Sequence, residues 1–202
     1  MSGSIRDLEL TVEARLLPLF FGFLQSGFLL ELTVDGTVSE FLQNRCKLST
    51  DEIAERVATV FIDGQPVDDI EQAIVRDRCT LALSGAMPGL VGAVMRSNSP
   101  LRSFRGSITH QGSESDSETG QGLIRVKLFN TVLRDVGPVL LRDGILLEPQ
   151  KVGELLEERF KGLEDAVIEV VFEGTPTDVR AVLGSRQFIN SELLVLSVRT
   201  GG

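Results

Sequence analysis

The sequence contains no tryptophan and no tyrosine, although eleven of its 202 residues are phenylalanine. It therefore has no phenol that could exchange a proton and no indole N–H, and only phenylalanine could stack on a base or a sugar. A single histidine, His110, and two cysteines, Cys46 and Cys79, are too few for a common structural zinc site. Because acid–base and metal chemistry are poorly supplied, we expect a protein that is not itself an enzyme and that binds no metal or cofactor of its own.

Positive charge is also scarce. The chain has 20 lysines and arginines against 29 aspartates and glutamates, which gives a formal net charge of −9. Neutralising the phosphates of a nucleic acid requires a surplus of basic residues, so we expect no nucleic-acid partner. Because 42% of the residues are hydrophobic and 24% are charged, the composition supports a folded core and excludes a wholly disordered chain.

Long hydrophobic runs are missing as well. The most apolar stretch, residues 16–30, is shorter than the roughly 20 residues that a membrane-spanning helix needs, and Pro18 and Gly22 interrupt it. Acidic residues precede it where a secretory signal would have basic ones. We interpret the run as two buried strands around a turn at residues 25–27, and we expect no membrane association.

The two cysteines show no pattern typical of a disulfide framework or a redox motif. Cys46 and Cys79 lie in apolar surroundings and are far apart in the sequence, without CxxC spacing. A small buried hydrophobe is the ordinary role of such a residue. The sequence therefore predicts two buried free thiols in a cytoplasmic protein.

One segment divides the chain. Residues 111–122, with the sequence QGSESDSETGQG, contain no apolar side chain and cannot contribute to a core. We therefore predict a flexible linker over residues 107–122, which separates a domain of residues 1–106 from a domain of residues 123–202. The first domain ends in a basic, glycine-rich extension.

The second half is expected to repeat, in looser form, the order of elements of the first. In the first half we expect strands at 16–23 and 28–34, helices at 38–45 and 50–56, and strands at 57–62, 65–67 and 79–83. In the second half we expect strands at 123–133 and 144–148, a helix at 149–160, and strands at 166–172 and 193–198. Thr37 and Glu40 have the spacing of a capping box, and Asp63 followed by Gly64 indicates a hairpin turn.

Several segments carry a likeness to a known family. They are TVSEFL (37–42), VFIDGQPV (60–67) and DRCTLALSGAMPG (77–89) in the first half, and IRVKLFNTVLRDVG (124–137), VGELLEERF (152–160) and VLSVRTGG (195–202) in the second. Together they resemble the ubiquitin-like β-grasp sulfur carriers, such as the small subunit of molybdopterin synthase and the thiamine-thiazole sulfur carrier. The resemblance implies an α+β fold of two ubiquitin-like β-grasp domains joined by the flexible linker.

The resemblance also implies a function. In that family an E1-like adenylating enzyme uses ATP to activate the terminal carboxylate, which then passes sulfur or a conjugate to an acceptor or target protein. By this likeness Gly202 would supply the carboxylate, and Gly201, which has no side chain, would leave room for the tail to enter the ATP site of the enzyme. Arg199 and Thr200 would steer the tail. A free, extended tail over residues 197–202 would favour this carrier function. A tail packed into a sheet would favour the alternative, an interaction or scaffold protein without covalent chemistry.

Two further segments are candidate binding sites. Between residues 79 and 113 there is no acidic residue, and three arginines could dock an anion or an acidic partner: Arg96, Arg102 and Arg105. The alternative is an exposed basic loop. Three glycines suggest a phosphate cradle: Gly85, Gly89 and Gly92. Their spacing matches no phosphate-binding motif, so close packing of a loop on a sheet is the competing interpretation.

Overall fold

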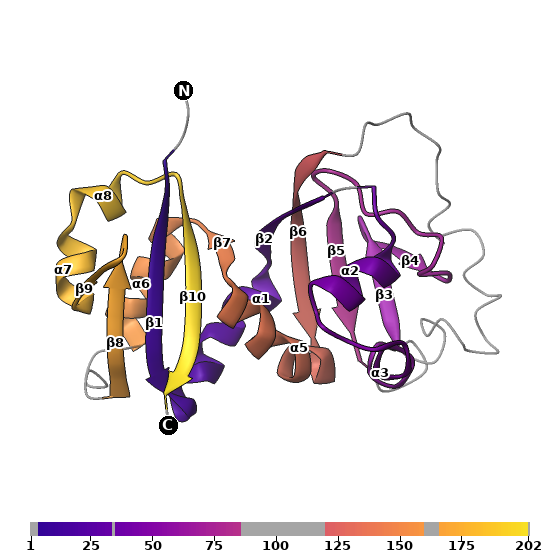
Figure 1. Cartoon of the computed structure of the whole chain (residues 1–202), viewed down its shortest axis with the longest axis horizontal. Helices are drawn as coiled ribbons and strands as arrows, with labels where there is room; N and C mark the ends of the chain where they lie inside the picture. Colours follow the sequence, from indigo (N-terminus) through magenta and orange to yellow (C-terminus); the bar gives the residue numbers. More distant parts are fainter. Residues whose placement is uncertain (1–3, 34, 86–119, 160–165, 202) are drawn as a thin grey trace. The chain divides into compact units, whose positions relative to one another are not determined.

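A computed structural model describes residues 4–33, 35–85, 120–159 and 166–201 (Figure 1). The strands are β1 (Ile5–Glu13), β2 (Phe28–Thr33), β3 (Thr59–Ile62), β4 (Gln65–Val67), β5 (Thr80–Ser84), β6 (Gln121–Phe129), β7 (Ile145–Leu147), β8 (Val167–Phe172), β9 (Thr175–Thr177) and β10 (Leu193–Gly201). The helices are η1 (Ala14–Phe20), α1 (Phe21–Ser26), α2 (Val38–Asn44), α3 (Thr50–Arg56), α5 (Asn130–Asp143), α6 (Pro149–Arg159), α7 (Val179–Gly184) and α8 (Arg186–Ile189).

The chain forms two compact units that do not follow its two halves. Unit 1 consists of Met1–Gly22 and Leu140–Gly202, and unit 2 consists of Phe23–Val139. The strands of unit 1 follow the order β7-β10-β1-β8-β9, and those of unit 2 the order β4-β3-β5-β6-β2. Each unit contains one parallel pair of strands, β1 with β10 and β5 with β6, and its other described pairs are antiparallel.

The first strand of the chain is an inner strand of unit 1. β1 pairs in parallel with β10 over nine residues, from Ile5 opposite Leu193 to Glu13 opposite Gly201. Its other side pairs with β8 in the antiparallel direction. Alternate residues of a strand point to the same face, and those of β1 that face the core are fully buried: Leu8, Leu10 and Val12. Residues from the two ends of the described chain thus share one core.

Strand β6 is the strand of unit 2 that comes from the second half of the chain. It pairs in parallel with β5 and in the antiparallel direction with β2, and its alternate residues Ile124, Val126 and Leu128 are fully buried. Four segments of similar sequence recur in the corresponding elements: FLLE (28–31) and ILLE (145–148), VSEFL (38–42) and VGELL (152–156), VFIDGQPV (60–67) and VVFEGTPT (170–177), LALS (81–84) and LVLS (194–197). The recurring segments indicate a duplicated arrangement in which each repeat gives its first strand to the other. The place of that strand differs between the units, since β1 lies between β8 and β10 and β6 lies between β5 and β2.

In each unit a pair of hydrogen bonds of the same kind joins a hairpin turn to a neighbouring strand, which is β5 of the same repeat in unit 2 and β1 of the other repeat in unit 1. In unit 2 the Asp63 N–H donates to the Thr80 carbonyl at 2.9 Å, and the Thr80 N–H donates to Asp63 Oδ1 at 2.7 Å. In unit 1 the Glu173 N–H donates to the Asp7 carbonyl at 3.0 Å, and the Asp7 N–H donates to Glu173 Oε1 at 2.7 Å. The bond from Asp7, assisted by the Arg6 guanidinium at 2.6 Å, holds the pKa of Glu173 below its usual value.

The two turns are alike in backbone conformation as well. Asp63 and Gly64 have φ of 50° and 80°, and Glu173 and Gly174 have φ of 52° and 71°. Two-residue turns with positive φ suit the twist of an antiparallel hairpin, which explains the hairpins β3–β4 and β8–β9. The hairpin predicted at Asp63–Gly64 is confirmed, as is the capping box at the start of α2.

The predicted fold class, two ubiquitin-like β-grasp domains joined by a flexible linker, is wrong. Each such domain would complete its sheet with its own first strand. Instead, β1 of the first half pairs with β8 and β10 of the second, while β6 of the second half pairs with β2 and β5 of the first. Strand neighbours are chosen by tertiary packing, which an alternating apolar pattern does not specify. Of the predicted linker, residues 107–119 lie outside the described residues, and Gln121 and Gly122 begin β6.

The apolar run that was predicted to form strands is helical over its first part. Residues 14–26 form η1 and α1, and their buried side chains recur at helical spacing: Leu16, Phe20, Phe23 and Leu24. The strand prediction for residues 16–23 is therefore wrong, while β2 confirms the strand after it. No helix in the described ranges is both long and apolar enough to cross a membrane.

The exchange of first strands predicts how the chain behaves when it is cut. We expect that a chain cleaved at a protease site introduced between residues 107 and 119 elutes from a gel-filtration column as one particle at the volume of the uncut chain. Each unit contains strands from both fragments, and separating them would break the pairs β1–β10 and β5–β6. Two separately eluting, folded fragments would contradict the exchange.

Candidate functional site

Three of the four residues predicted to form a carrier tail belong to a strand. Arg199, Thr200 and Gly201 end β10 and lie opposite the last residues of β1, while Gly202 lies outside the described residues. A side-chain carbon added at Gly201 would lie 2.5 Å from Cδ1 of Ile168, so glycine fits a close packing there. The structure thus brings these residues into a sheet and not into a free tail.

Arg199 lies in a polar hollow of about 670 Å³ in unit 1, together with Glu9, Arg142 and Asp143. The two cations of this hollow are paired. Arg199 Nη1 lies 3.5 Å from Glu9 Oε2, and Arg142 Nε lies 2.9 Å from Asp143 Oδ1. A bound anion would compete with a carboxylate at each arginine, so the hollow is a weak candidate for an anion site.

The other predicted candidates are described only at one residue. Arg96, Arg102 and Arg105 lie outside the described residues, as do Gly89 and Gly92. Gly85 follows β5, and a side-chain carbon there would overlap the hydroxyl oxygen of Thr131 on α5. Its close approach to α5 supports the interpretation that this glycine serves packing.

A hollow of about 590 Å³ beside α2 in unit 2 is a further candidate. Asp35 lines it with a positive φ of 70°, and no described residue donates a hydrogen bond to its buried Oδ2 atom. The carboxylate of the neighbouring Glu40 already accepts the Thr37 N–H at 2.8 Å.

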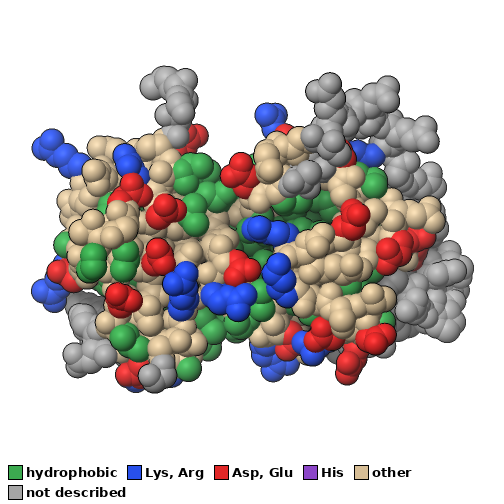
Figure 2. All heavy atoms as spheres, viewed as in Figure 1, with side chains coloured by type: hydrophobic (Ala, Val, Ile, Leu, Met, Phe, Trp, Pro, Cys, Tyr) green, Lys and Arg blue, Asp and Glu red, His purple; other side chains and the backbone are tan. Residues whose placement is uncertain are grey.

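Within the described ranges no group of three histidines, cysteines or acidic residues could hold a metal ion. Charged side chains of both signs are mixed on the face shown in Figure 2.

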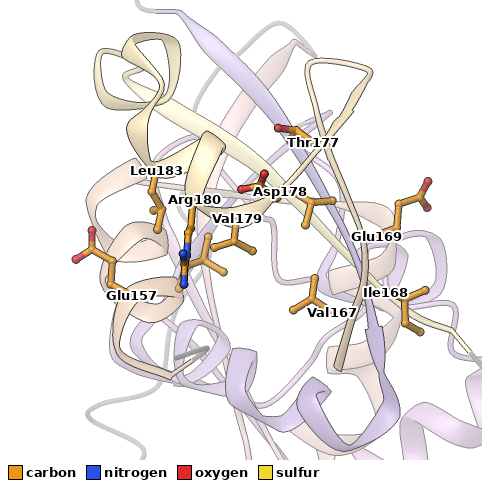
Figure 3. Close-up of a pocket in the computed structure, with 11 residues that line it drawn as sticks. Glu157, Val167, Ile168, Glu169, Thr177, Asp178, Val179, Arg180 and Leu183 are labelled. Carbon is orange, nitrogen blue, oxygen red and sulfur yellow. The ribbon is translucent and has the colours of Figure 1, made fainter. Parts of the chain in front are cut away.

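A groove of about 690 Å³ in unit 1 is lined by both apolar and charged residues, and we call it the α6–α7 groove (Figure 3). Four elements supply its walls: α6, β8, β9 and α7. The lining residues are Leu156, Glu157, Val167, Ile168, Glu169, Val170, Thr177, Asp178, Val179, Arg180 and Leu183.

The floor of the α6–α7 groove is apolar. Leu156 of α6 and Val170 of β8 are buried, while Val179 and Leu183 of α7 are half-buried. Strand β8 changes its register against β1 at Thr11 and Val12, which is the irregularity of a β-bulge. As a result β8 exposes two successive side chains, and Ile168 is 55% exposed. The core of unit 1 therefore continues into a surface that the described residues leave open.

The charged groups of the groove have distinct orientations. Figure 3 shows that Arg180 and Asp178 point toward the apolar residues, whereas Glu157 and Glu169 point away from them. The Asp178 carboxylate accepts the Ala181 N–H at 2.8 Å and so caps α7. Arg180 forms no ion pair or hydrogen bond with any residue of the described ranges. The groove thus combines an apolar floor with a cation that no described residue pairs with.

Fold and site together define the class of this chain as a duplicated α+β protein with exchanged first strands and an apolar groove in one unit. Comparison with protein-family models, with curated proteins and with solved structures gives no match. The resemblance to the sulfur carriers therefore stays a prediction.

The groove residues of α7 were not among the predicted site residues, although Asp178 before an apolar stretch is a signal for a helix start.

The packing of Gly85 can be tested by substitution. We expect Gly85→Ala to lower the free energy of unfolding by about 1–3 kcal/mol, because the added methyl group overlaps Thr131. Gly22→Ala is the matched control, since a side chain there meets nothing within 4 Å and alanine favours the helix. Urea unfolding curves measure both. Equal stabilities of the two variants would contradict the assignment.

The two cysteines are free and buried, which confirms that part of the prediction. Burial raises the pKa of Cys46 to about 12, although the nearby Arg45 acts in the opposite direction. Burial also raises the pKa of Cys79 to about 11. Both thiols are therefore in the neutral form at neutral pH.

These pKa values predict unreactive thiols. At pH 8 we expect both to react with a disulfide reagent about a hundredfold more slowly than a free thiol, and both to react at once after unfolding. Because unfolded thiols ionise near pH 8.5, the folded state should also lose stability as the pH rises above that value. A fast-reacting thiol in the folded chain would contradict this result.

Proposed function

We propose that this chain is a binding protein whose ligand occupies the α6–α7 groove. The observation that carries the proposal is a groove of about 690 Å³ that combines an apolar floor with charged residues. Sites for small molecules are usually hollows of about 300–1,000 Å³ of this character. A ligand that covers Val167, Val179 and Leu183 removes apolar surface from water, which favours binding.

The predicted carrier function stays untested, and the geometry gives it less support than the binding function. Activation by an E1-like enzyme would require the residues Arg199–Gly201 to leave their pairs with β1. The groove needs no such opening. The proposal therefore develops the alternative of an interaction protein and places the interaction in unit 1.

Two isoleucines of similar exposure allow a matched test. Ile168 lines the groove and is 55% exposed, whereas Ile189 on α8 is 62% exposed and does not line it. We expect Ile168→Asp to weaken binding of Nile red, a neutral apolar dye, about tenfold, because it places a charge at the β8 edge of the groove. Fluorescence titration measures the dissociation constant.

The variant Ile189→Asp is the control and should bind the dye as the unchanged chain does. Both side chains are more than half exposed, so both variants should fold. An unchanged affinity in Ile168→Asp, or an equal loss in both variants, would reject the groove as the binding site.

A further inference from the structure

We infer that the ligand of the α6–α7 groove is an apolar monocarboxylate whose carboxylate pairs with Arg180. The inference rests on the proposed function and adds the chemical class of the ligand. Arg180 is the one cation among the described lining residues, and its side chain extends along the apolar floor beside Val179 and Leu183 (Figure 3). Within the described ranges no carboxylate lies close enough to pair with it.

The chemistry of arginine explains why the ligand must supply a negative charge. A guanidinium stays protonated at every pH at which a protein is folded, so it cannot escape burial by losing its proton. A ligand that covers the floor also removes water from Arg180. A carboxylate restores the lost hydrogen bonds with two parallel N–H···O contacts, which a neutral ligand cannot provide.

The acidic groups of the groove limit the charge that the ligand can carry. Asp178 points inward, but its carboxylate already accepts the Ala181 N–H. Glu157 and Glu169 point away and act from the rim through solvent. Three negative charges around one positive charge disfavour a dianion such as a phosphate monoester, whereas a single carboxylate beside Arg180 is neutralised directly. The apolar floor then receives the rest of the molecule.

Three probes with the same alkyl chain and different head groups test the ligand class: decanoate, decanol and decylammonium. They are titrated into the full chain below their micelle-forming concentrations, and methyl NMR signals of Val179 and Leu183 report binding in the groove. We expect decanoate to bind about tenfold more tightly than decanol, and decylammonium to bind more weakly than decanol.

A pair of arginine variants tests the partner. Arg180→Gln should make decanoate and decanol bind equally, whereas Arg186→Gln should keep the preference, because Arg186 lies on α8 outside the groove. Both side chains are exposed, so neither change should unfold the chain.

The outcomes separate the two proposals. If decanol or decylammonium binds as tightly as decanoate, or if Arg180→Gln keeps the preference, the carboxylate assignment is overturned while the groove remains a binding site. If none of the three probes shifts the groove methyl signals, the proposed function fails as well.

Discussion

The insertion of β1 between β8 and β10 is the constraint on which unit 1 depends. Without it these strands would lack a neighbour, because the outer sides of the pair are taken by β7 and β9. The three inward side chains Leu8, Leu10 and Val12 are fully buried, and each stabilises the core by about 2 kcal/mol. Strand β8 carries one wall of the groove, so the groove has its geometry only because the start of the chain completes this sheet.

Glu173 connects the same strand to the groove. Its carboxylate accepts N–H groups from Asp7 and Arg6, both on β1, while its backbone forms the turn into β9. Strand β9 leads directly to Asp178 and α7, which supply the opposite wall. In unit 2 Asp63 makes the same pair of hydrogen bonds to Thr80, but there the strand that the turn meets is β5 of its own repeat. The two repeats differ in the segment after the hairpin.

Local structure could be predicted from this sequence better than the choice of strand partners. The capping box of Thr37 and Glu40 and the turn at Asp63–Gly64 depend on neighbouring residues, and both predictions are confirmed. The exchange of β1 and β6 could not be predicted, because both strands present buried aliphatic side chains at alternate positions and would fit either sheet. The predicted strand at 16–23 was wrong because its apolar side chains were counted as a run, although their spacing is helical.

The groove could not be predicted from the sequence, because no single residue indicates it. Arg180 and Leu183 are ordinary helix residues, and their importance comes from the bulge at Ile168 and from the end of α6. In unit 2 the segment after the matching hairpin, residues 68–79, contains no helix, whereas the segment after β9 forms α7 and α8. The hairpin turns are alike in both repeats, and a connecting segment that follows such a turn at the surface can change without loss of stability. The groove lies at such a segment, which is where a new binding site could arise in one copy alone.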